Sequence, residues 1–155
     1  MLRYRIPDRW NGPQIGRHCP QVFVGHCREM SNCYAMQKKY PEAIAAIKEV
    51  QGSNAGTPRI LGGLAFVYAA SGDRDKALKI VERLKPVAEA NAEIAVRLGQ
   101  VFIVLGDMDS AFEWLEKAYQ RRAPLLRTLK ADFFYDSVRS DPRFKDLLRR
   151  MGLPL

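Results

Sequence analysis

Long apolar runs are missing from this 155-residue sequence. The longest stretch without a charged residue covers thirteen positions, from Ile60 to Gly72, whereas a membrane-spanning helix needs about 20. The first residues turn polar and proline-rich without an apolar segment, which argues against a secretory signal. We therefore expect a cytoplasmic protein with no membrane partner.

Cysteine and histidine are also scarce, with three cysteines and two histidines in the whole chain. A small, odd number of cysteines excludes a disulfide scaffold, and we expect all three to be reduced. The five residues lie between His18 and Cys33, and zinc favours such ligands, but no two cysteines have the C-x2-C spacing of structural zinc sites. We therefore expect no metal site.

Catalytic motifs are absent too. No serine lies in a G-x-S-x-G element, and Gly62-Gly63 lacks the spacing and the lysine of a phosphate-binding loop. These two glycines fall inside a predicted helix, where each costs about 1 kcal/mol relative to alanine. We expect no catalysis and no cofactor. We also expect another backbone, from a neighbouring helix or a bound peptide, to approach closely at Gly62 and Gly63.

Acidic residues are outnumbered, and the net charge is +8. The excess lies at the ends: residues 1–33 carry a net charge of +3, residues 34–120 are neutral, and residues 121–155 carry +5. A nucleic-acid-binding domain more often carries its charge on the folded body. Basic ends instead indicate solvated faces or an acidic partner.

A 34-residue repeat organises the middle of the chain. Three columns recur at this offset: Ala43, Ala77 and Ala111; Tyr34, Tyr68 and Phe102; Ile47, Val81 and Leu115. The pairs Gly72-Asp73 and Gly106-Asp107 share it. Glycine suits the position just past a helix end, and aspartate suits the start of the next helix. Each unit is therefore predicted as helix, tight turn and helix, with the aspartates as caps rather than as cation ligands.

Apolar spacing, prolines and caps predict eight helices and no strand. The predicted ranges are 25–38, 41–51, 58–71, 74–85, 92–105, 108–121, about 125–138, and a last helix that starts at Ser140-Asp141-Pro142 and ends at Gly152. Residues 1–24 contain three prolines and no apolar period. We expect them to be an irregular or flexible extension; alternatively they fold back over the first helix, or the chain is the tail of a longer array.

These residues resemble the tetratricopeptide repeat family, which has a 34-residue helix-turn-helix unit. The third unit carries the resemblance best, with Leu98-Gly99, Phe102, Gly106, Ala111, Leu115 and Ala118. The resemblance implies an all-α solenoid of three helical hairpins over residues 25–123, with capping helices over residues 124–155. Apolar side chains of that last region, such as Leu126 and Leu129, are expected to cover the third hairpin.

The last third of the chain has a narrower resemblance. Residues 111–119, followed by Arg139-Ser140-Asp141-Pro142 and by residues 147–154, look like the C-terminal end of repeat regions that follow signalling modules in bacterial proteins. No such module is present in this sequence. The resemblance therefore implies a bacterial interaction domain, and it brings no catalytic activity with it.

The resemblance also implies a binding site, because the first helix of each hairpin lines the concave face in this family. The positions carried over as partner-binding are Arg28, Asn32, Met36, Phe66, Arg97, Gln100, Ile103 and Val104. Some family members clamp a C-terminal carboxylate there, but Glu93 and Gly63 occupy two of the clamp positions in this chain. A mostly apolar floor with polar groups at Arg97 and Gln100 remains. It suits an amphipathic helix or a hydrophobic peptide of a partner, or the chain's own residues 1–24.

The function expected from the sequence is thus protein–protein interaction without catalysis. One alternative is a regulatory fragment that acts only in cis within a longer signalling protein. Another is nucleic-acid binding through the basic ends, where Arg139, Arg143, Lys145, Arg149 and Arg150 gather. Another protein or a peptide is the expected partner, and self-association through the uncapped first repeat is a further possibility.

Overall fold

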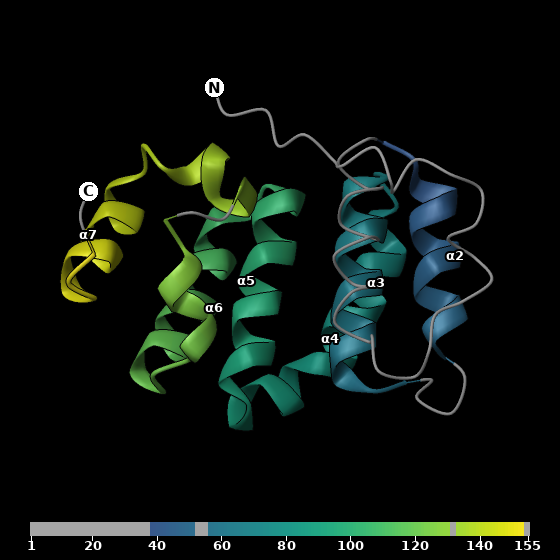
Figure 1. The fold of residues 1–155 in the computed structure, drawn as a ribbon, viewed down its shortest axis with the longest axis horizontal. Helices are drawn as coiled ribbons and strands as arrows, with labels where there is room; N and C mark the ends of the chain where they lie inside the picture. The colour runs from purple at the N-terminus through teal and green to yellow at the C-terminus, as the bar shows by residue number, and fades with distance from the viewer. Residues whose placement is uncertain (1–37, 52–55, 131–132, 154–155) are drawn as a thin grey trace, which may run out of the picture.

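The computed structural model describes residues 38–51, 56–130 and 133–153. Its elements are α2 (Tyr40–Gln51), α3 (Pro58–Ala70), α4 (Arg74–Ala90), α5 (Ala92–Leu105), α6 (Met108–Gln120), the 3-10 helices η3 (Pro124–Thr128) and η4 (Phe133–Val138), and α7 (Pro142–Arg150). No strand occurs within those ranges, so the all-α prediction is confirmed. The helices follow one another along the long axis, from α2 at one end to α7 at the other (Figure 1). Residues 25–37 of the predicted first helix and the extension 1–24 lie outside the described residues, and Lys38, predicted as the helix end, is a turn residue with a φ of 59°.

The turns between paired helices have the predicted local chemistry. Gly72 and Gly106 follow α3 and α5 with φ values of 86° and 80°, a left-handed conformation that glycine adopts without a steric penalty. Asp73 then accepts a hydrogen bond from the backbone N–H of Lys76 at 3.2 Å, and Asp107 accepts one from Ser110 at 3.1 Å. Both aspartates are therefore helix caps, as predicted.

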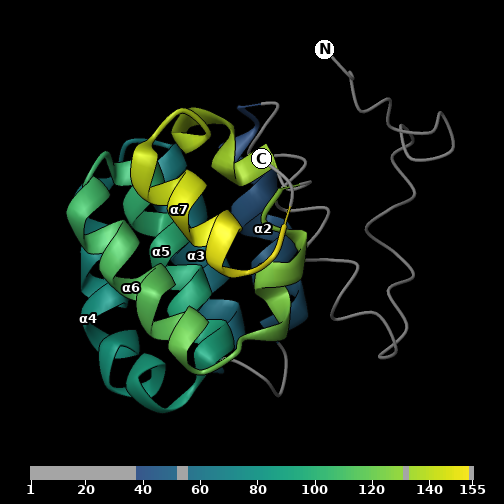
Figure 2. The ribbon, with the colours of Figure 1, turned by 90° about the vertical axis from the view of Figure 1, so that its left-hand side faces the viewer.

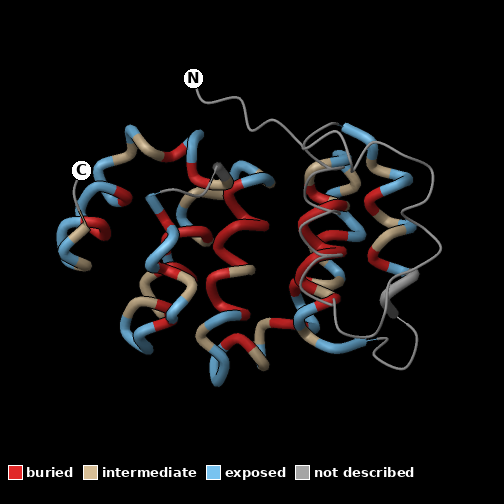
Figure 3. Tube along the Cα trace, in the orientation of Figure 1, coloured by how far each residue is buried: buried red, intermediate tan, exposed pale blue. Residues whose placement is uncertain are grey.

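The repeat columns form the core. Ala77 and Ala111 have no exposed surface, and neither do Val81 and Leu115. Helix α3 packs against α4, α5 packs against α6, and α3 and α5 lie against each other. Buried residues accordingly concentrate along α3 and α5 (Figure 3). These two helices have core contacts on most sides, which makes them the central elements of the array.

The close backbone approach lies at a different glycine from the predicted ones. A Cβ on Gly62 would meet Arg97 Cβ at 3.5 Å, and a Cβ on Gly63 would meet Ile47 Cδ1 at 3.6 Å. Both are ordinary side-chain contacts, so a close approach by the backbone of a neighbouring helix is not found at Gly62 or Gly63, and the alternative of a bound peptide stays a prediction. At Gly99 a Cβ would lie 2.9 Å from Leu115 Cγ and 3.3 Å from the carbonyl oxygen of Ala111. Gly99 therefore permits the close crossing of α5 and α6.

Helix α4 extends beyond the predicted end at residue 85. It continues through Pro86 to Ala90, and Asn91 then caps α5 by accepting hydrogen bonds from the backbone N–H groups of Glu93 and Ile94. A proline inside a helix removes one backbone hydrogen bond. Tertiary contacts support the last turn: Ala88 is fully buried, and the carboxylate of Glu89 accepts a hydrogen bond from Lys117 Nζ of α6 at 2.7 Å.

The single α-helix predicted at 125–138 is wrong. The chain instead forms η3 and η4, and residues 131–132 between them are not described. A 3-10 helix has three residues per turn, so side chains three apart lie on one side. Leu126 and Leu129 are buried at this spacing, and so are Tyr135 and Val138. The spacing of the buried residues in these two pairs is therefore that of a 3-10 helix rather than an α-helix.

Helix α7 continues the repeat offset. Its cap, Asp141, accepts a hydrogen bond from the backbone N–H of Arg143 at 2.8 Å. Asp141 lies 34 residues after Asp107, and Asp107 lies 34 residues after Asp73. Two ion pairs join α7 to α6 at this offset, Arg143 with Asp109 and Arg150 with Glu116.

The order of these pairs shows that α7 runs parallel to α6. In Figure 2 α7 lies in front, on the side of the array where α6 lies. Meanwhile η3 and η4 contact α5. Residues 124–153 thus hold the place of a fourth repeat unit: η3 and η4 take the position of its first helix, and α7 takes that of its second. The sequence predicts only a cap for the same region.

Candidate partner-binding site

The candidate site lies on α3 and α5. Phe66 belongs to α3, and Arg97, Gln100, Ile103 and Val104 belong to α5. We call the surface formed by these five residues the α3–α5 face. The other three candidates, Arg28, Asn32 and Met36, lie outside the described residues.

Most of the α3–α5 face is covered. Phe66 and Ile103 are buried, and Gln100 is only 2% exposed. Arg97 is half-buried. Val104 is 37% exposed, and it is the exposed large hydrophobic residue of the described part of the chain. The face therefore reaches solvent at Val104 and Arg97.

The cover comes from η4. The ring of Phe134 meets the ring of Phe66 edge to face, with centroids 4.7 Å apart and an interplanar angle of 85°. Such T-shaped pairs are favourable because the positive ring edge meets the negative ring face. Phe66, Gln100 and Phe134 are each 34 residues apart, so they hold the same position in three successive units. The described part of this column thus ends at Phe134, which contacts Phe66.

A buried hydrogen-bond chain lies beside these rings. Arg97 Nη1 donates to Gln100 Oε1 at 2.8 Å, and Gln100 Nε2 donates to the hydroxyl oxygen of Tyr135 at 3.2 Å. Tyr135 is 1% exposed and stacks on Phe144 of α7, with centroids 5.7 Å apart. Both ends of the Gln100 amide are therefore paired, as a buried polar group requires.

Phe134 and Tyr135 were not among the predicted site residues. The sequence feature that points to them is the 34-residue offset from Gln100 to Phe134, with Tyr135 as the next residue. That offset is obscured because the first helix of the fourth unit is replaced by 3-10 turns.

Arg139 ties the ends of the segment that carries these aromatics. Its Nε donates to Asp136 Oδ1 at 2.7 Å, and its Nη1 donates to the carbonyl oxygen of Lys130 at 2.5 Å. One guanidinium thus joins Lys130, which follows η3, to Asp136 within η4. These contacts link η4, which lies against α5, to Lys130.

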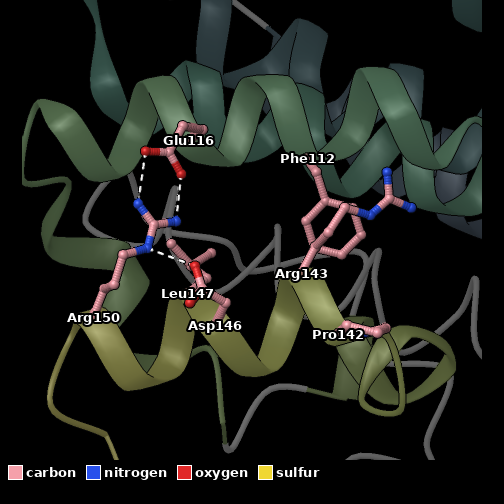
Figure 4. Close-up of a pocket in the computed structure, with 7 residues that line it drawn as sticks. All are labelled: Phe112, Glu116, Pro142, Arg143, Asp146, Leu147 and Arg150. Atoms are coloured by element: carbon pink, nitrogen blue, oxygen red, sulfur yellow. Dashed lines mark hydrogen bonds and ion pairs between the residues drawn. The ribbon is translucent and has the colours of Figure 1, made fainter.

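A second candidate location is the groove between α6 and α7, about 470 Å³ in volume. Figure 4 shows its lining, with Arg143 over the ring of Phe112 and Arg150 facing Glu116. The Arg143 guanidinium lies 4.4 Å from the centroid of Phe112. Arg150 Nη1 and Nη2 donate to the two carboxylate oxygens of Glu116 at 2.9 and 2.6 Å.

The charges in this groove are matched. The hydrogen bond from Arg150 lowers the pKa of the Glu116 carboxyl, and that from Arg143 lowers the pKa of Asp141. All three nitrogens of each guanidinium contact carboxylates: those of Arg143 contact Asp109 and Asp141, and those of Arg150 contact Glu116 and Asp146. The groove is therefore a joint between α6 and α7, in which each guanidinium nitrogen already contacts a carboxylate of the chain.

The described residues place no other chemistry in a site. Within residues 38–51, 56–130 and 133–153, no three His, Cys, Asp or Glu side chains are arranged to hold a metal ion. The predicted histidine and cysteine cluster lies outside these ranges. Each helix of the described chain is too short or too polar to span a membrane.

Comparison with known proteins agrees with this architecture. The profile of the family described as Tetratricopeptide repeat matches residues 34–90, which include α2, α3 and α4. Neither the curated proteins nor the solved structures contain a match. The hairpin of α5 and α6 lies outside the matched range and continues the same 34-residue offset. The resemblance to the tetratricopeptide repeat family is thus confirmed over residues 34–90.

Proposed function

We propose that this protein binds a peptide or helix of a partner protein on the α3–α5 face and catalyses no reaction. Tetratricopeptide repeats generally mediate protein–protein interaction, and this face holds the positions that line the binding surface in the family. The observation that carries the proposal is the exposure of Val104. It is a large apolar side chain that reaches solvent on a helix with an otherwise buried apolar side.

The chemistry around Val104 favours an amphipathic partner segment. An apolar side chain of the partner gains by covering Val104, because apolar surface leaves water. Arg97 lies seven residues earlier, two turns along the same side of α5, and supplies positive charge. A helix or extended peptide with an apolar side and acidic neighbours matches both features.

The ion pairs of α7 support a protein partner over nucleic acid. A phosphate-binding surface needs cationic donors that are available to phosphate oxygens. Arg143 and Arg150 instead contact carboxylates of their own chain through every guanidinium nitrogen. Arg149 pairs with Asp146, and Arg139 pairs with Asp136. Four of the five basic residues gathered there are thus already paired.

Site-specific photo-crosslinking tests the proposal. The photoreactive residue p-benzoyl-phenylalanine replaces Val104 in one variant and Arg83, an exposed residue on α4, in a control. Both variants are irradiated in a lysate of the organism that encodes the protein, and the crosslinked peptides are sequenced by mass spectrometry. We expect one partner segment to crosslink at position 104 and not at position 83. The same segment at both positions, or a partner at position 83 alone, would contradict binding on this face.

A further inference from the structure

The first-helix position of the fourth unit holds shorter helices than that of the second and third units. In the second and third units it holds α3 and α5, α-helices of 13 and 14 residues. In the fourth unit it holds η3 and η4, 3-10 segments of five and six residues. Hydrogen-bond geometry in a 3-10 helix is poorer than in an α-helix. This position therefore carries the least stable backbone of the three.

Two adjacent aromatic residues attach η4 to the α3–α5 face. Phe134 contacts Phe66 of α3 edge to face, and the Tyr135 hydroxyl accepts a hydrogen bond from Gln100 of α5. One ring and one phenol oxygen thus contact two successive repeats. Both receiving residues, Phe66 and Gln100, belong to the positions that the family uses for partner binding. The chain's own segment shows which chemistry fits this face.

We propose that the α3–α5 face recognises a partner segment with an adjacent phenylalanine–tyrosine pair, and that Phe134 and Tyr135 occupy this site when no partner is bound. Partner binding and docking of η4 then exclude each other. This inference rests on the proposed function and adds the chemistry of the partner and a means of self-regulation.

The resting molecule is closed under this proposal. Tyr135 and Val138 are buried, and Arg139 holds the ends of the segment together through Lys130 and Asp136. When only a fraction of molecules has an open site, the apparent affinity for a ligand falls by that fraction. The intact protein therefore binds such a partner weakly, and any change that frees η4 strengthens binding.

A peptide experiment tests this exclusion directly. The probe is a fluorescently labelled peptide with the sequence of residues 130–140, KADFFYDSVRS, measured by anisotropy against the full chain. We expect the double variant Phe134→Ala/Tyr135→Ala to bind the probe at least tenfold more tightly than the wild type. Adding Phe66→Ala to that variant should weaken binding at least tenfold. A folded double variant that binds the probe no better than the wild type overturns the proposal.

Two control peptides test the chemistry. The same peptide with alanine in place of Phe134 and Tyr135 should not bind, whereas equal binding would show that the aromatic pair is not recognised. A peptide of residues 1–24, the other segment expected to reach this face, should not bind the double variant either. Competition of that peptide with the probe would assign the face to the N-terminal segment and overturn the proposal.

Hydrogen exchange on the wild-type protein covers the case in which the double variant unfolds. If η4 opens while α5 stays folded, amides of residues 133–138 should exchange at least a hundredfold faster than those of residues 96–103. Equal protection of both segments would overturn the proposal. A failed peptide experiment with a partner crosslinked at Val104 would refute only this inference, whereas failure of the crosslinking at Val104 would refute the proposed function itself.

Discussion

Arg150 of α7 and Glu116 of α6 form a bidentate ion pair, and the two residues lie 34 positions apart in the sequence, which is one repeat length. The guanidinium of Arg150 also lies 4.8 Å from the ring centroid of Tyr119, which is on the same helix as Glu116. Seven residues earlier on both helices, Arg143 pairs with Asp109 and lies over Phe112. The same joint of arginine, carboxylate and aromatic ring is thus repeated after two helical turns.

We expect the Arg150–Glu116 pair to contribute a coupling energy of about 0.5–1 kcal/mol, since bidentate geometry strengthens a pair that solvent partly screens. A double-mutant cycle with Arg150→Ala and Glu116→Ala, followed by urea unfolding, measures it. The Lys85–Glu82 pair within α4 is the control, because both partners are more exposed. Equal coupling in the two pairs would contradict a special role for the joint.

The same coupling should depend on pH. The hydrogen bond from Arg150 lowers the folded-state pKa of Glu116 below its ordinary value of 4.5. A lowered pKa means that the unfolded chain binds the proton more readily than the folded protein does. The coupling should therefore be complete above about pH 4.5 and should fall as the pH drops through the lower folded-state value. Coupling that stays constant down to the acid limit of folding would contradict this assignment.

Two glycine substitutions should have opposite effects. Gly62→Ala should stabilise the protein by up to about 1 kcal/mol, because alanine favours the helix and its Cβ meets only ordinary contacts. Gly99→Ala should destabilise it by about 1 kcal/mol or more, because its Cβ would lie 2.9 Å from Cγ of the fully buried Leu115. Thermal unfolding followed by circular dichroism compares the two. If both substitutions stabilised the protein, α5 and α6 would be able to move apart without a loss of folding free energy.

Enlarging a repeat-column alanine should overpack the core. Ala111→Leu places a large side chain at a position with no exposed surface, where α6 crosses α5, and we expect a loss of about 1–3 kcal/mol. The control is Ala45→Leu, at an exposed position on α2. An unchanged unfolding midpoint for Ala111→Leu would show that the repeat phasing is incorrect.

Removing the Tyr135 hydroxyl should leave a buried donor unpaired. In Tyr135→Phe the Nε2 group of Gln100 loses its acceptor at a position that is 2% exposed, and we expect a cost of about 1–3 kcal/mol. Combining Tyr135→Phe with Gln100→Leu should cost less than the sum of the single changes, as measured by chemical unfolding. Strict additivity would mean that the two residues do not interact.

Features set by neighbouring residues were predictable from the sequence. Asp73 and Asp107 cap helices because a carboxylate beside free backbone N–H groups is satisfied locally. Gly72 and Gly106 adopt positive φ because the chain must leave a helix within one residue. The core columns through Ala77 and Ala111 follow from the 34-residue period, which the three units share.

Features set by distant residues were not predictable in the same way. Helix α4 passes Pro86 because Lys117, on another helix, holds its last turn. Residues 124–128 and 133–138 form 3-10 helices because Leu126 and Leu129, and likewise Tyr135 and Val138, are buried at a spacing of three. Phe66 and Gln100 were expected to be accessible, whereas they are covered by residues 68 and 35 positions later, a pairing that no local pattern contains.

The polar outer side of α7 has a consequence for assembly. Arrays of stacked helical units have open ends, and a head-to-tail contact that does not close into a ring grows into a filament. On α7 the exposed residues include Lys145, Asp146 and Arg149. A second molecule that stacked on α7 would remove water from these charged side chains, which costs free energy unless new polar contacts replace that water. We therefore expect the charged outer side of α7 to disfavour end-to-end stacking of molecules at this end of the array.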